Sequence, residues 1–337
     1  MSGRLRFEYR PSSADPATTL YVDGTEPGFR SLSHWPGNST PAALKHDLST
    51  GIALGFVARA PAEQRALLGE FEVVANNHYD TDGVASAFAL LFPGPALQWE
   101  DELLAAAATG DFSVWRGEEA LALDLTVTAL AHAPAAPFAA ALPPAPDDDA
   151  RHAAAYAWLL AELPALLEDP LAWRSLWAEE FERTVADVQR IEEGTGISVR
   201  HFPEADLALV SSDRPLTSIG LHLAAGDASR VLAVLAARDG FRYRYRERVE
   251  SWFELVSRRV PPRRDLTAVI AALNAAEGVT RGATAQWWSQ PAGFPVRELG
   301  FGDPAQAAQV NFGDPQAERD PPSRLLPSAV IDALRKV

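Results

Sequence analysis

The sequence FEVVANNHYDTDGVASAFALLF at residues 71–92 constrains the fold most, because an apolar strand, a polar turn and a helix follow one another there. Residues 71–75 are typical of a buried strand, and residues 83–91 form a helix of small and apolar side chains. The turn between them follows the carboxyl end of the strand. In an open α/β sheet, ligands bind at that edge. We therefore expect an α/β fold with its functional site at this turn.

Three side chains that bind metals stand at alternate positions in the turn, namely His78, Asp80 and Asp82. Residues two apart can face one point while the chain is extended. Carboxylates favour Mg²⁺ or Mn²⁺, and an added imidazole shifts the preference toward Mn²⁺, Fe²⁺ or Zn²⁺. The same residues also fit a plain turn in which an Asp caps the helix. The flanking strand and helix favour the metal site.

The stretch NNHYDTDGVASAFAL resembles the first motif of the DHH-type phosphoesterases. The resemblance implies a site with two metals, in which His78, Asp80 and Asp82 hold Mn²⁺ or Mg²⁺, with Asp80 and Asp82 as the catalytic carboxylates. Most of the chain is also similar to a bacterial family related to these enzymes, through LSHWPGNSTPAALKHDLSTGIAL and RYRERVESWFELVSRR. That second likeness brings no assigned activity.

The chain departs from the DHH pattern in two ways. The Asp-His-His run that names those enzymes does not occur in the 337 residues. Their second motif is a lone Asp at a strand end, and its best candidate is Asp111 in TGDFSVW, although the preceding LLAAAAT reads as a helix. His132, or a His from elsewhere in the chain, is a candidate for the missing imidazole. A partly filled site could bind one metal and have lost catalysis.

Composition limits the classes of protein that this chain can belong to. With 47% hydrophobic residues it can bury large cores, and the formal charge of −15 disfavours non-specific binding to nucleic acids or anionic membranes. The absence of cysteine excludes disulfides and zinc–cysteine sites. There is no signal peptide at the start and no long apolar run, so we expect a cytoplasmic protein with no membrane contact.

The pattern along the chain predicts an N-terminal lobe with a mainly parallel sheet and flanking helices, and an α+β C-terminal lobe. We place a metal-binding domain at residues 1–135, an Ala/Pro-rich connection with aromatic-rich helices at 136–195, and the α+β domain at 196–337. In the first domain, residues 4–10 and 19–24 are expected to pair as strands. A helix capped by Thr40 is expected at 41–58, with further helices at 101–108 and 118–131.

In the C-terminal lobe the apolar runs predict alternating strands and helices. Strands are expected at 197–202, 205–212, 217–225, 241–249 and 251–259, and helices at 227–239, 265–276 and 329–335. A polar, Pro-rich tail is expected at 303–323.

Arginines alternate with aromatic residues in FRYRYRERV at residues 241–249. On a strand the aromatic side chains would pack inward while the arginines line a surface. Guanidinium groups bind phosphate bidentately, so Arg244 and Arg246 are candidate substrate ligands, with Arg258 and Arg259 behind them. The alternative is a solvated strand face whose arginines pair with the protein's surplus of acids.

The turn SHWPGN places His34 and Asn38 in a loop after a strand, where they could touch a ligand. A plain turn is the alternative. Taken together, these features predict a divalent-metal-dependent phosphoesterase that acts on a small phosphoester, phosphodiester or nucleotide. The alternatives are a non-catalytic anion- or nucleotide-binding protein with the same fold, and an assembly module. The sequence leaves open whether the protein is a homo-oligomer.

Overall fold

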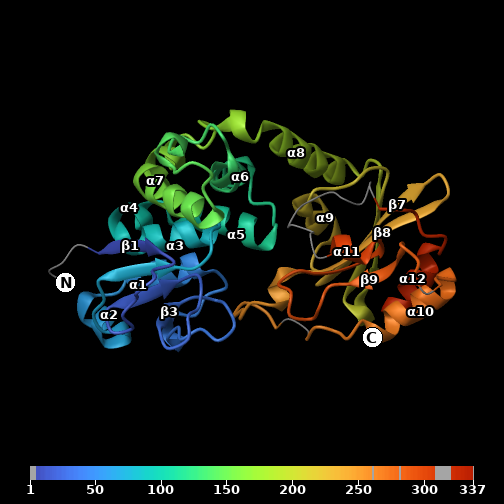
Figure 1. Cartoon of the computed structure of the whole chain (residues 1–337), viewed down its shortest axis with the longest axis horizontal. Coiled ribbons are helices and arrows are strands. Elements are labelled where there is room, and N and C mark those ends of the chain that lie inside the picture. Colours follow the sequence, from blue (N-terminus) through green and yellow to red (C-terminus); the bar gives the residue numbers. More distant parts are fainter. Residues whose placement is uncertain (1–4, 260–261, 281, 308–319, 337) are drawn as a thin grey trace. The chain divides into compact units, whose positions relative to one another are not determined.

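The computed structural model describes residues 5–259, 262–280, 282–307 and 320–336. The chain forms two compact units (Figure 1). Unit 1 comprises residues 1–181 and 253–259, and unit 2 comprises residues 182–252 and 260–337. Unit 1 extends past the predicted end at residue 135, because helix α7 (Asp148–Glu168) buries Tyr156, Leu159 and Leu163 in its core.

Unit 1 is built on a parallel sheet with the strand order β1-β4-β2-β3. The strands are β1 (Arg6–Tyr9), β2 (Thr19–Val22), β3 (Arg30–Leu32) and β4 (Val73–Asn76). The predicted parallel sheet is confirmed. The expected pairing of β1 with β2 is wrong, because β4 inserts between them and pairs with both.

Helices flank this sheet (Figure 1). They are α1 (Ser49–Val57), α2 (Pro61–Leu68), α3 (Thr81–Leu91), α4 (Pro93–Gln98), α5 (Glu100–Phe112), α6 (Glu118–His132) and α7. Residues 81–90 of α3 are all buried, and their small side chains let α1 and β4 pack closely against it. The carboxyl ends of three parallel strands therefore surround the start of α3.

The predicted helix at 41–58 is divided into a 3₁₀ turn at Ala42–Leu44 and helix α1. Thr40 does not cap a helix. Its hydroxyl instead accepts a hydrogen bond from the Ser33 amide and donates to the Ser33 carbonyl. The break places the first amides of α1 beside the metal turn, which matters for the site described below.

Unit 2 contains a mixed sheet with the order β5-β6-β7-β8-β10-β9, in which only the β6–β7 pair is parallel among the described residues. Its strands are β5 (Ile197–Phe202), β6 (Leu207–Ser212), β7 (Arg230–Ala237), β8 (Gly240–Glu247), β9 (Gln286–Ser289) and β10 (Arg297–Gly302). Helices α9 (Ser218–Ala225), α10 (Thr267–Glu277), α11 (Pro304–Ala307) and α12 (Pro327–Leu334) accompany it. The α+β prediction is confirmed.

Three predicted elements of unit 2 are wrong. Residues 217–225 form α9 rather than a strand, because the Thr217 hydroxyl caps the helix by accepting from the Gly220 amide. Residues 227–239 contain β7 rather than a helix, since short apolar runs fit either element and the strand is buried between its two neighbours. Residues 251–259 form turns instead of a strand. Most of the predicted tail at 303–323 lies outside the described residues.

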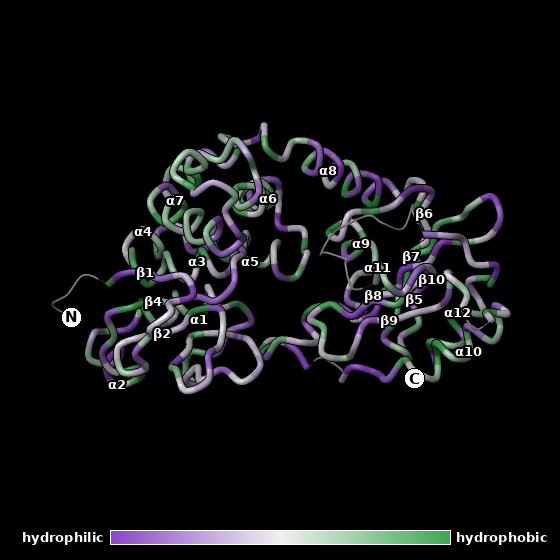
Figure 2. The backbone as a smooth tube through the Cα atoms, in the orientation of Figure 1, coloured by the Kyte–Doolittle hydropathy of each residue, from purple (hydrophilic) through white to green (hydrophobic). Residues whose placement is uncertain are grey.

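Helix α8 (Ala178–Glu193) lies in the region where aromatic-rich helices were predicted, residues 136–195. Its tube in Figure 2 shows both polar and apolar residues, and Phe181 and Val188 are buried while Glu192 is exposed. The adjoining Trp177 is also buried and donates from its indole nitrogen to Thr126 Oγ1 at 2.9 Å. No helix within the described ranges combines the length and apolar character that crossing a bilayer requires.

Arg244 and Arg246 of β8 are buried in ion pairs, which contradicts the expectation that they line a surface. Tyr243 and Tyr245 do pack into the core of unit 2 as predicted. On the other face, Arg244 and Arg246 are each only 7% exposed. Both bind Glu298, at 3.1 Å and 2.7 Å, and Arg244 also binds Asp320 at 2.7 Å.

Replacing Glu298 by Ala should therefore destabilise unit 2, since two buried guanidinium groups would lose their shared carboxylate. We expect a loss of about 3–5 kcal/mol in the free energy of unfolding, measured by denaturant titration. The matched change Glu192→Ala on the exposed face of α8 should cost less than about 0.5 kcal/mol. Equal, small effects of both changes would show that the arginines do not depend on this pairing.

Candidate metal centre

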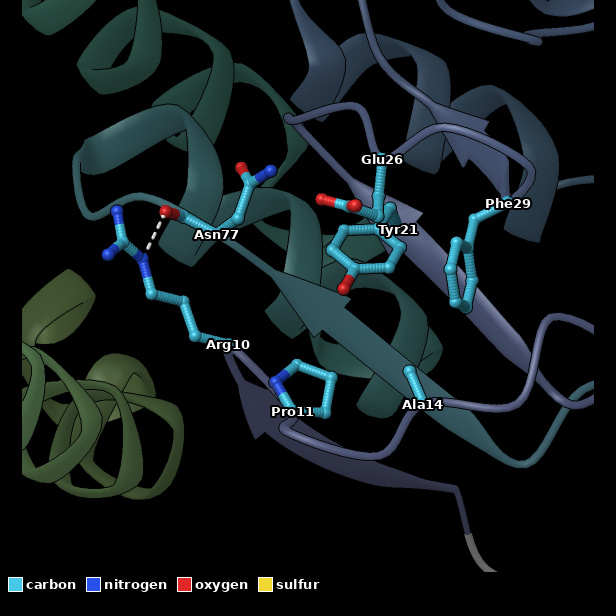
Figure 3. Close-up of a pocket in the computed structure, with 7 residues that line it drawn as sticks. All are labelled: Arg10, Pro11, Ala14, Tyr21, Glu26, Phe29 and Asn77. Atoms are coloured by element: carbon cyan, nitrogen blue, oxygen red, sulfur yellow. Dashed lines mark hydrogen bonds between the residues drawn. The ribbon is translucent and has the colours of Figure 1, made fainter.

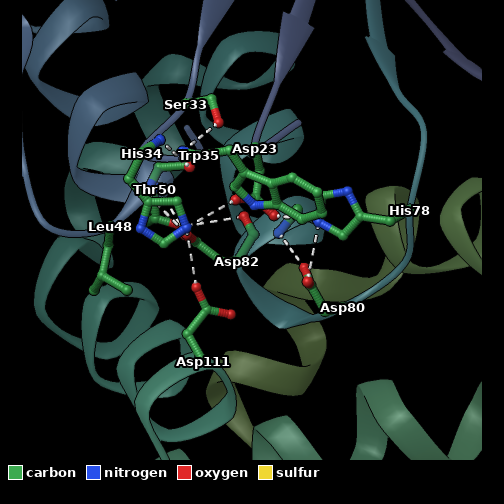
Figure 4. A network of polar contacts seen from close by, with 12 residues as sticks. Asp23, Ser33, His34, Trp35, Leu48, Thr50, His78, Asp80, Asp82 and Asp111 are labelled. Atoms are coloured by element: carbon green, nitrogen blue, oxygen red, sulfur yellow. Dashed lines mark hydrogen bonds and ion pairs between the residues drawn. The ribbon is translucent and has the colours of Figure 1, made fainter. Parts of the chain in front are cut away.

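Four segments of unit 1 bring ionisable side chains to one place at the carboxyl edge of the sheet (Figure 4). Asp23 directly follows β2, and His34 comes two residues after β3. His78 and Asp80 lie in the turn after β4, and Asp82 lies in the first turn of α3. Asp111 comes from the last turn of α5. The carboxyl ends of parallel strands meet at one edge, which explains why residues so distant in sequence converge.

The side chains form two groups that could each hold a metal ion, and Asp23 belongs to both. In the first group, Asp23, His34, Asp82 and Asp111 offer atoms that all lie within 4.8 Å of one another. His34 Nε2 is 3.3 Å from Asp111 Oδ2, 3.5 Å from Asp23 Oδ1 and 3.7 Å from Asp82 Oδ2. Ligands bound at about 2.1 Å to one cation are about 3–3.5 Å apart. These spacings suit a cation between the four atoms.

The second group consists of Asp23, His78 and Asp80. His78 Nε2 lies 2.8 Å from Asp23 Oδ2 and 3.0 Å from Asp80 Oδ2. The two oxygens of Asp23 thus point to different groups, Oδ1 to the first and Oδ2 to the second. A carboxylate placed in this way can bridge two cations.

Two buried polar atoms in the first group, Asp23 Oδ1 and His34 Nε2, have no hydrogen-bond partner among the residues that the structure describes. Leaving such an atom unpaired costs about 1–3 kcal/mol, so native structures rarely contain them without a reason. The two atoms are 3.5 Å apart and face the same point. A cation at that point would satisfy both.

The backbone fixes the imidazole of His34 in the form that binds metals. His34 Nδ1 lies 2.5 Å from the carbonyl oxygen of Asp47, which can only accept a hydrogen bond. Nδ1 therefore carries the proton, and in the neutral ring Nε2 presents its lone pair to the carboxylates. Histidine ligands are oriented in this manner in known metal sites.

Asp80 and Asp82 each combine a capping role with a place in the cluster. Asp80 Oδ1 accepts from the Gly83 amide at 2.8 Å and caps α3, while its Oδ2 faces His78. Asp82 accepts from the Ser49 and Thr50 amides, at 2.8 Å and 2.7 Å, at the start of α1. The plain-turn alternative and the metal alternative are therefore compatible, since the same carboxylates make the capping bonds and face the cluster.

Burial and mutual repulsion set the protonation of the carboxylates. Burial, followed by the charge of Asp23, raises the pKa of Asp82 to about 7. Burial and the charge of Asp82 raise the pKa of Asp111 well above its usual range. Burial also acts on Asp23, but the neighbouring His78 and His34 outweigh it and lower its pKa. Asp23 is therefore the anion around which the others are arranged.

The same carboxylates raise the pKa of both imidazoles, so that each imidazole retains a proton. Burial lowers the pKa of His34, but the nearby carboxylates of Asp111, Asp23 and Asp82 raise it well above its usual value. The charges of Asp80 and Asp23 likewise raise the pKa of His78 above its usual value against the effect of burial. In the absence of a cation, protons neutralise the cluster.

Aromatic rings cover both imidazoles. Phe253 stacks on His34 with ring centroids 3.8 Å apart, and Trp35 lies against His78 at 4.5 Å. Phe253 begins the segment 253–259, which packs in unit 1 although it comes late in the chain. Such cover excludes water and strengthens electrostatic interactions within the cluster.

The residues predicted for the metal, His78, Asp80, Asp82 and Asp111, all lie in the cluster. Asp111 does so from the end of a helix rather than from a strand end. His34, predicted as a substrate contact, supplies the imidazole that the sequence left unassigned. The other candidate, His132, lies outside the cluster on α6, where it is exposed.

The other residues predicted to bind substrate are not among the side chains of the cluster. The amide of Asn38 is already engaged, since its Nδ2 donates to Trp35 O and Glu254 Oε2 and its Oδ1 accepts from Lys45 Nζ. Arg258 is half-buried and Arg259 is exposed, and both lie in the segment 253–259 of unit 1. Arg244 and Arg246 belong to unit 2 and are engaged by acids there.

Sequence reasoning missed Asp23, which both groups share. The signal was present, since Asp23 follows the apolar strand TLYV and precedes Gly24. Its φ of 50° is left-handed, a conformation that Asp tolerates better than most residues and that occurs often at functional sites. A lone Asp after a short strand looks like a turn residue until its position beside β4 is known.

A scan against protein families matches residues 5–337 to a family of unknown function, DUF6687. The chain belongs to the DUF6687 family. The match covers both units, so the metal centre and the mixed sheet belong to one family architecture. Searches of curated proteins and of solved structures found no match to this DUF6687 chain.

Mn²⁺ affinity should rise with pH, because a cation needs the ionised carboxylates and neutral imidazoles that protons otherwise neutralise. Folding raises the pKa of Asp82 from 3.8 to about 7, so protonation of Asp82 stabilises the metal-free fold at low pH. This stabilisation is lost as pH rises through 7. For each proton that is released when Mn²⁺ binds, the affinity for Mn²⁺ should rise about tenfold per unit increase in pH.

This pH dependence can be measured by titration calorimetry between pH 6 and 8 in two buffers with different enthalpies of ionisation. The apparent enthalpy should differ between the buffers in proportion to the protons released. An affinity that stays constant over this range, with no buffer dependence, would contradict the assignment of these groups as ligands.

Proposed function

We propose that the protein is a divalent-metal-dependent phosphoesterase, with Mn²⁺ or Mg²⁺ as cofactor and a small phosphoester, phosphodiester or nucleotide as substrate. One observation carries the proposal, the two groups of ligand-type atoms that share Asp23. Two cations held a few ångströms apart by a bridging carboxylate are the arrangement that phosphoryl-transfer enzymes use.

The charge of the cluster supports two cations rather than one. Asp23, Asp80, Asp82 and Asp111 contribute four negative charges when ionised, and two divalent cations supply four positive ones. An uncompensated buried charge is strongly unfavourable, so a balanced site is the stable one. The mixture of carboxylate and imidazole ligands suits Mn²⁺ best among the hard cations.

The resemblance of the turn after β4 to the DHH-type phosphoesterases supports the same function. His78, Asp80 and Asp82 match the first motif of those enzymes, and Asp111 is the candidate for their second motif, although it lies at the end of a helix rather than of a strand. The absence of the Asp-His-His run remains a departure. Here His34 adds the further imidazole from the end of β3.

The exposure of the ligands indicates from which side a substrate enters. Asp80 has 38% of its side chain exposed, whereas Asp23, Asp82 and Asp111 have 7% or less. Bound cations would supply Lewis-acid charge and an activated water. Hydrolysis then joins the water oxygen to phosphorus and breaks the bond to the leaving oxygen, which takes up a proton. Asp80 is the carboxylate placed to orient the reacting groups at the open side.

The proposal is tested with Mn²⁺-replenished protein and two generic substrates, p-nitrophenyl phosphate and bis-p-nitrophenyl phosphate. We expect saturable, Mn²⁺-dependent release of p-nitrophenol from at least one of them. Asp111→Asn should reduce the rate by about 10²–10³-fold, the usual effect of removing one group that stabilises the transition state. Asp101→Asn provides the matched control, because Asp101 is exposed on the same helix α5.

The same variants separate loss of function from loss of fold. Asn resembles the protonated form of Asp111, which burial favours, so Asp111→Asn should leave the metal-free protein folded at pH 8. It should abolish most of the rise in unfolding temperature that Mn²⁺ gives. Thermal stabilisation by Mn²⁺ and phosphate without turnover of either substrate would refute the enzyme and leave a non-catalytic anion-binding protein.

A further inference from the structure

A pocket of about 450 Å³ lies in unit 1 (Figure 3). Its lining includes the aromatic side chains of Tyr21 and Phe29, the Glu26 carboxylate, the Asn77 amide and Arg10. The metal centre does not use any of these side chains. The proposed metal centre therefore does not account for this pocket.

Two loops contribute to both the pocket and the metal centre. The loop after β2 supplies Asp23 to the centre and Glu26 to the pocket, three residues or at most about 10 Å of chain apart. The loop after β4 supplies Asn77 to the pocket and the adjoining His78 to the centre. Asn77 Oδ1 also lies 3.4 Å from His78 Nδ1. A small molecule with two parts could occupy the pocket and the centre at once.

These loops are tightly held against each other. A Cβ on Gly24 would lie 2.5 Å from Asn77 Oδ1, so only glycine fits there. Asn77 Nδ2 donates to Thr25 O at 3.0 Å, and Arg10 Nε donates to Asn77 O at 2.7 Å. Arg10 itself has a left-handed φ of 44°, a strained conformation that tends to occur at ligand sites. The pocket is preorganised rather than formed by chance on a loose surface.

The lining offers a planar apolar wall beside a donor and an acceptor. Tyr21 and Phe29 pack edge to face with centroids 5.2 Å apart. The Glu26 carboxylate is exposed and makes no hydrogen bond or ion pair with the described residues. Asn77 uses one of its two amide N–H groups on Thr25 and keeps the other. Figure 3 shows the Glu26 carboxylate and the Asn77 amide on the same rim of the pocket.

We propose that this pocket binds the base of a nucleotide, guanine in preference to adenine, while the phosphate lies at the metal centre. The proposal rests on the proposed function and specifies its substrate. Guanine has two neighbouring N–H donors that a carboxylate such as Glu26 can accept, beside an O6 acceptor for the Asn77 amide. Adenine lacks that pair of donors on its edge. Stacking on Phe29, which is only half-buried, would hold either base.

The experiment uses guanosine and adenosine, which carry no phosphate, with the full-length protein in the presence of EDTA. Binding is measured by titration calorimetry and by saturation-transfer NMR. We expect guanosine to bind at least about tenfold more tightly than adenosine. Glu26→Gln should weaken guanosine binding about tenfold and leave adenosine binding unchanged, whereas Phe29→Ala should weaken both.

Glu162→Gln is the matched control, because Glu162 is exposed on α7 and should not alter binding of either nucleoside. Unfolding temperatures verify that each variant is folded. The proposal is overturned if metal-free protein binds no guanosine, if adenosine binds as well, or if Glu26→Gln binds guanosine as tightly as the unaltered chain does. Because neither metal nor phosphate is present, these outcomes are independent of p-nitrophenyl ester turnover, which tests the enzyme itself.

Discussion

The repulsion among four clustered carboxylates, three of them almost fully enclosed, is the constraint on which the site depends. Asp23, Asp82 and Asp111 are almost fully enclosed, and Asp80 is the one that solvent reaches. Water is too far away to screen these charges, so something else must offset them. Raised pKa values on Asp82 and Asp111 show that the chain alone does so only by retaining protons. Divalent cations would offset the negative charges of the carboxylates without the need for protonation.

The surrounding fold holds this unfavourable arrangement in place. The first amides of α1 bind Asp82, and the carbonyl of Asp47 orients His34. Tyr156 on α7 accepts from Asn76 Nδ2 at 2.9 Å and donates to the His78 carbonyl at 3.1 Å. α3 comes so close that a Cβ on Gly83 would lie 2.5 Å from the Tyr156 hydroxyl. Each contact fixes a ligand before any ion arrives, which lowers the entropic cost of binding.

Local signals in the sequence were enough to predict the strand–turn–helix with His78, Asp80 and Asp82, because those residues are adjacent in the chain. They did not reveal that Asp23 and His34 complete the cluster, since that depends on β2 lying next to β4 and β3 next to β2. The burial of Arg244 and Arg246 was missed for a related reason. Their partners Glu298 and Asp320 come more than fifty residues later, and period-two alternation does not tell which face is covered. The exchange of helix and strand at 217–239 reflects the ambiguity of short apolar runs.

The central claim is that Asp23 bridges two cations, and electron paramagnetic resonance of the Mn²⁺-loaded protein tests it most directly. Two Mn²⁺ ions joined by a carboxylate are magnetically coupled. The account predicts two Mn²⁺ per chain with the spectrum of a coupled pair, changing to that of isolated ions in Asp23→Asn. A single uncoupled Mn²⁺ per chain, or no bound Mn²⁺ at all, would contradict it.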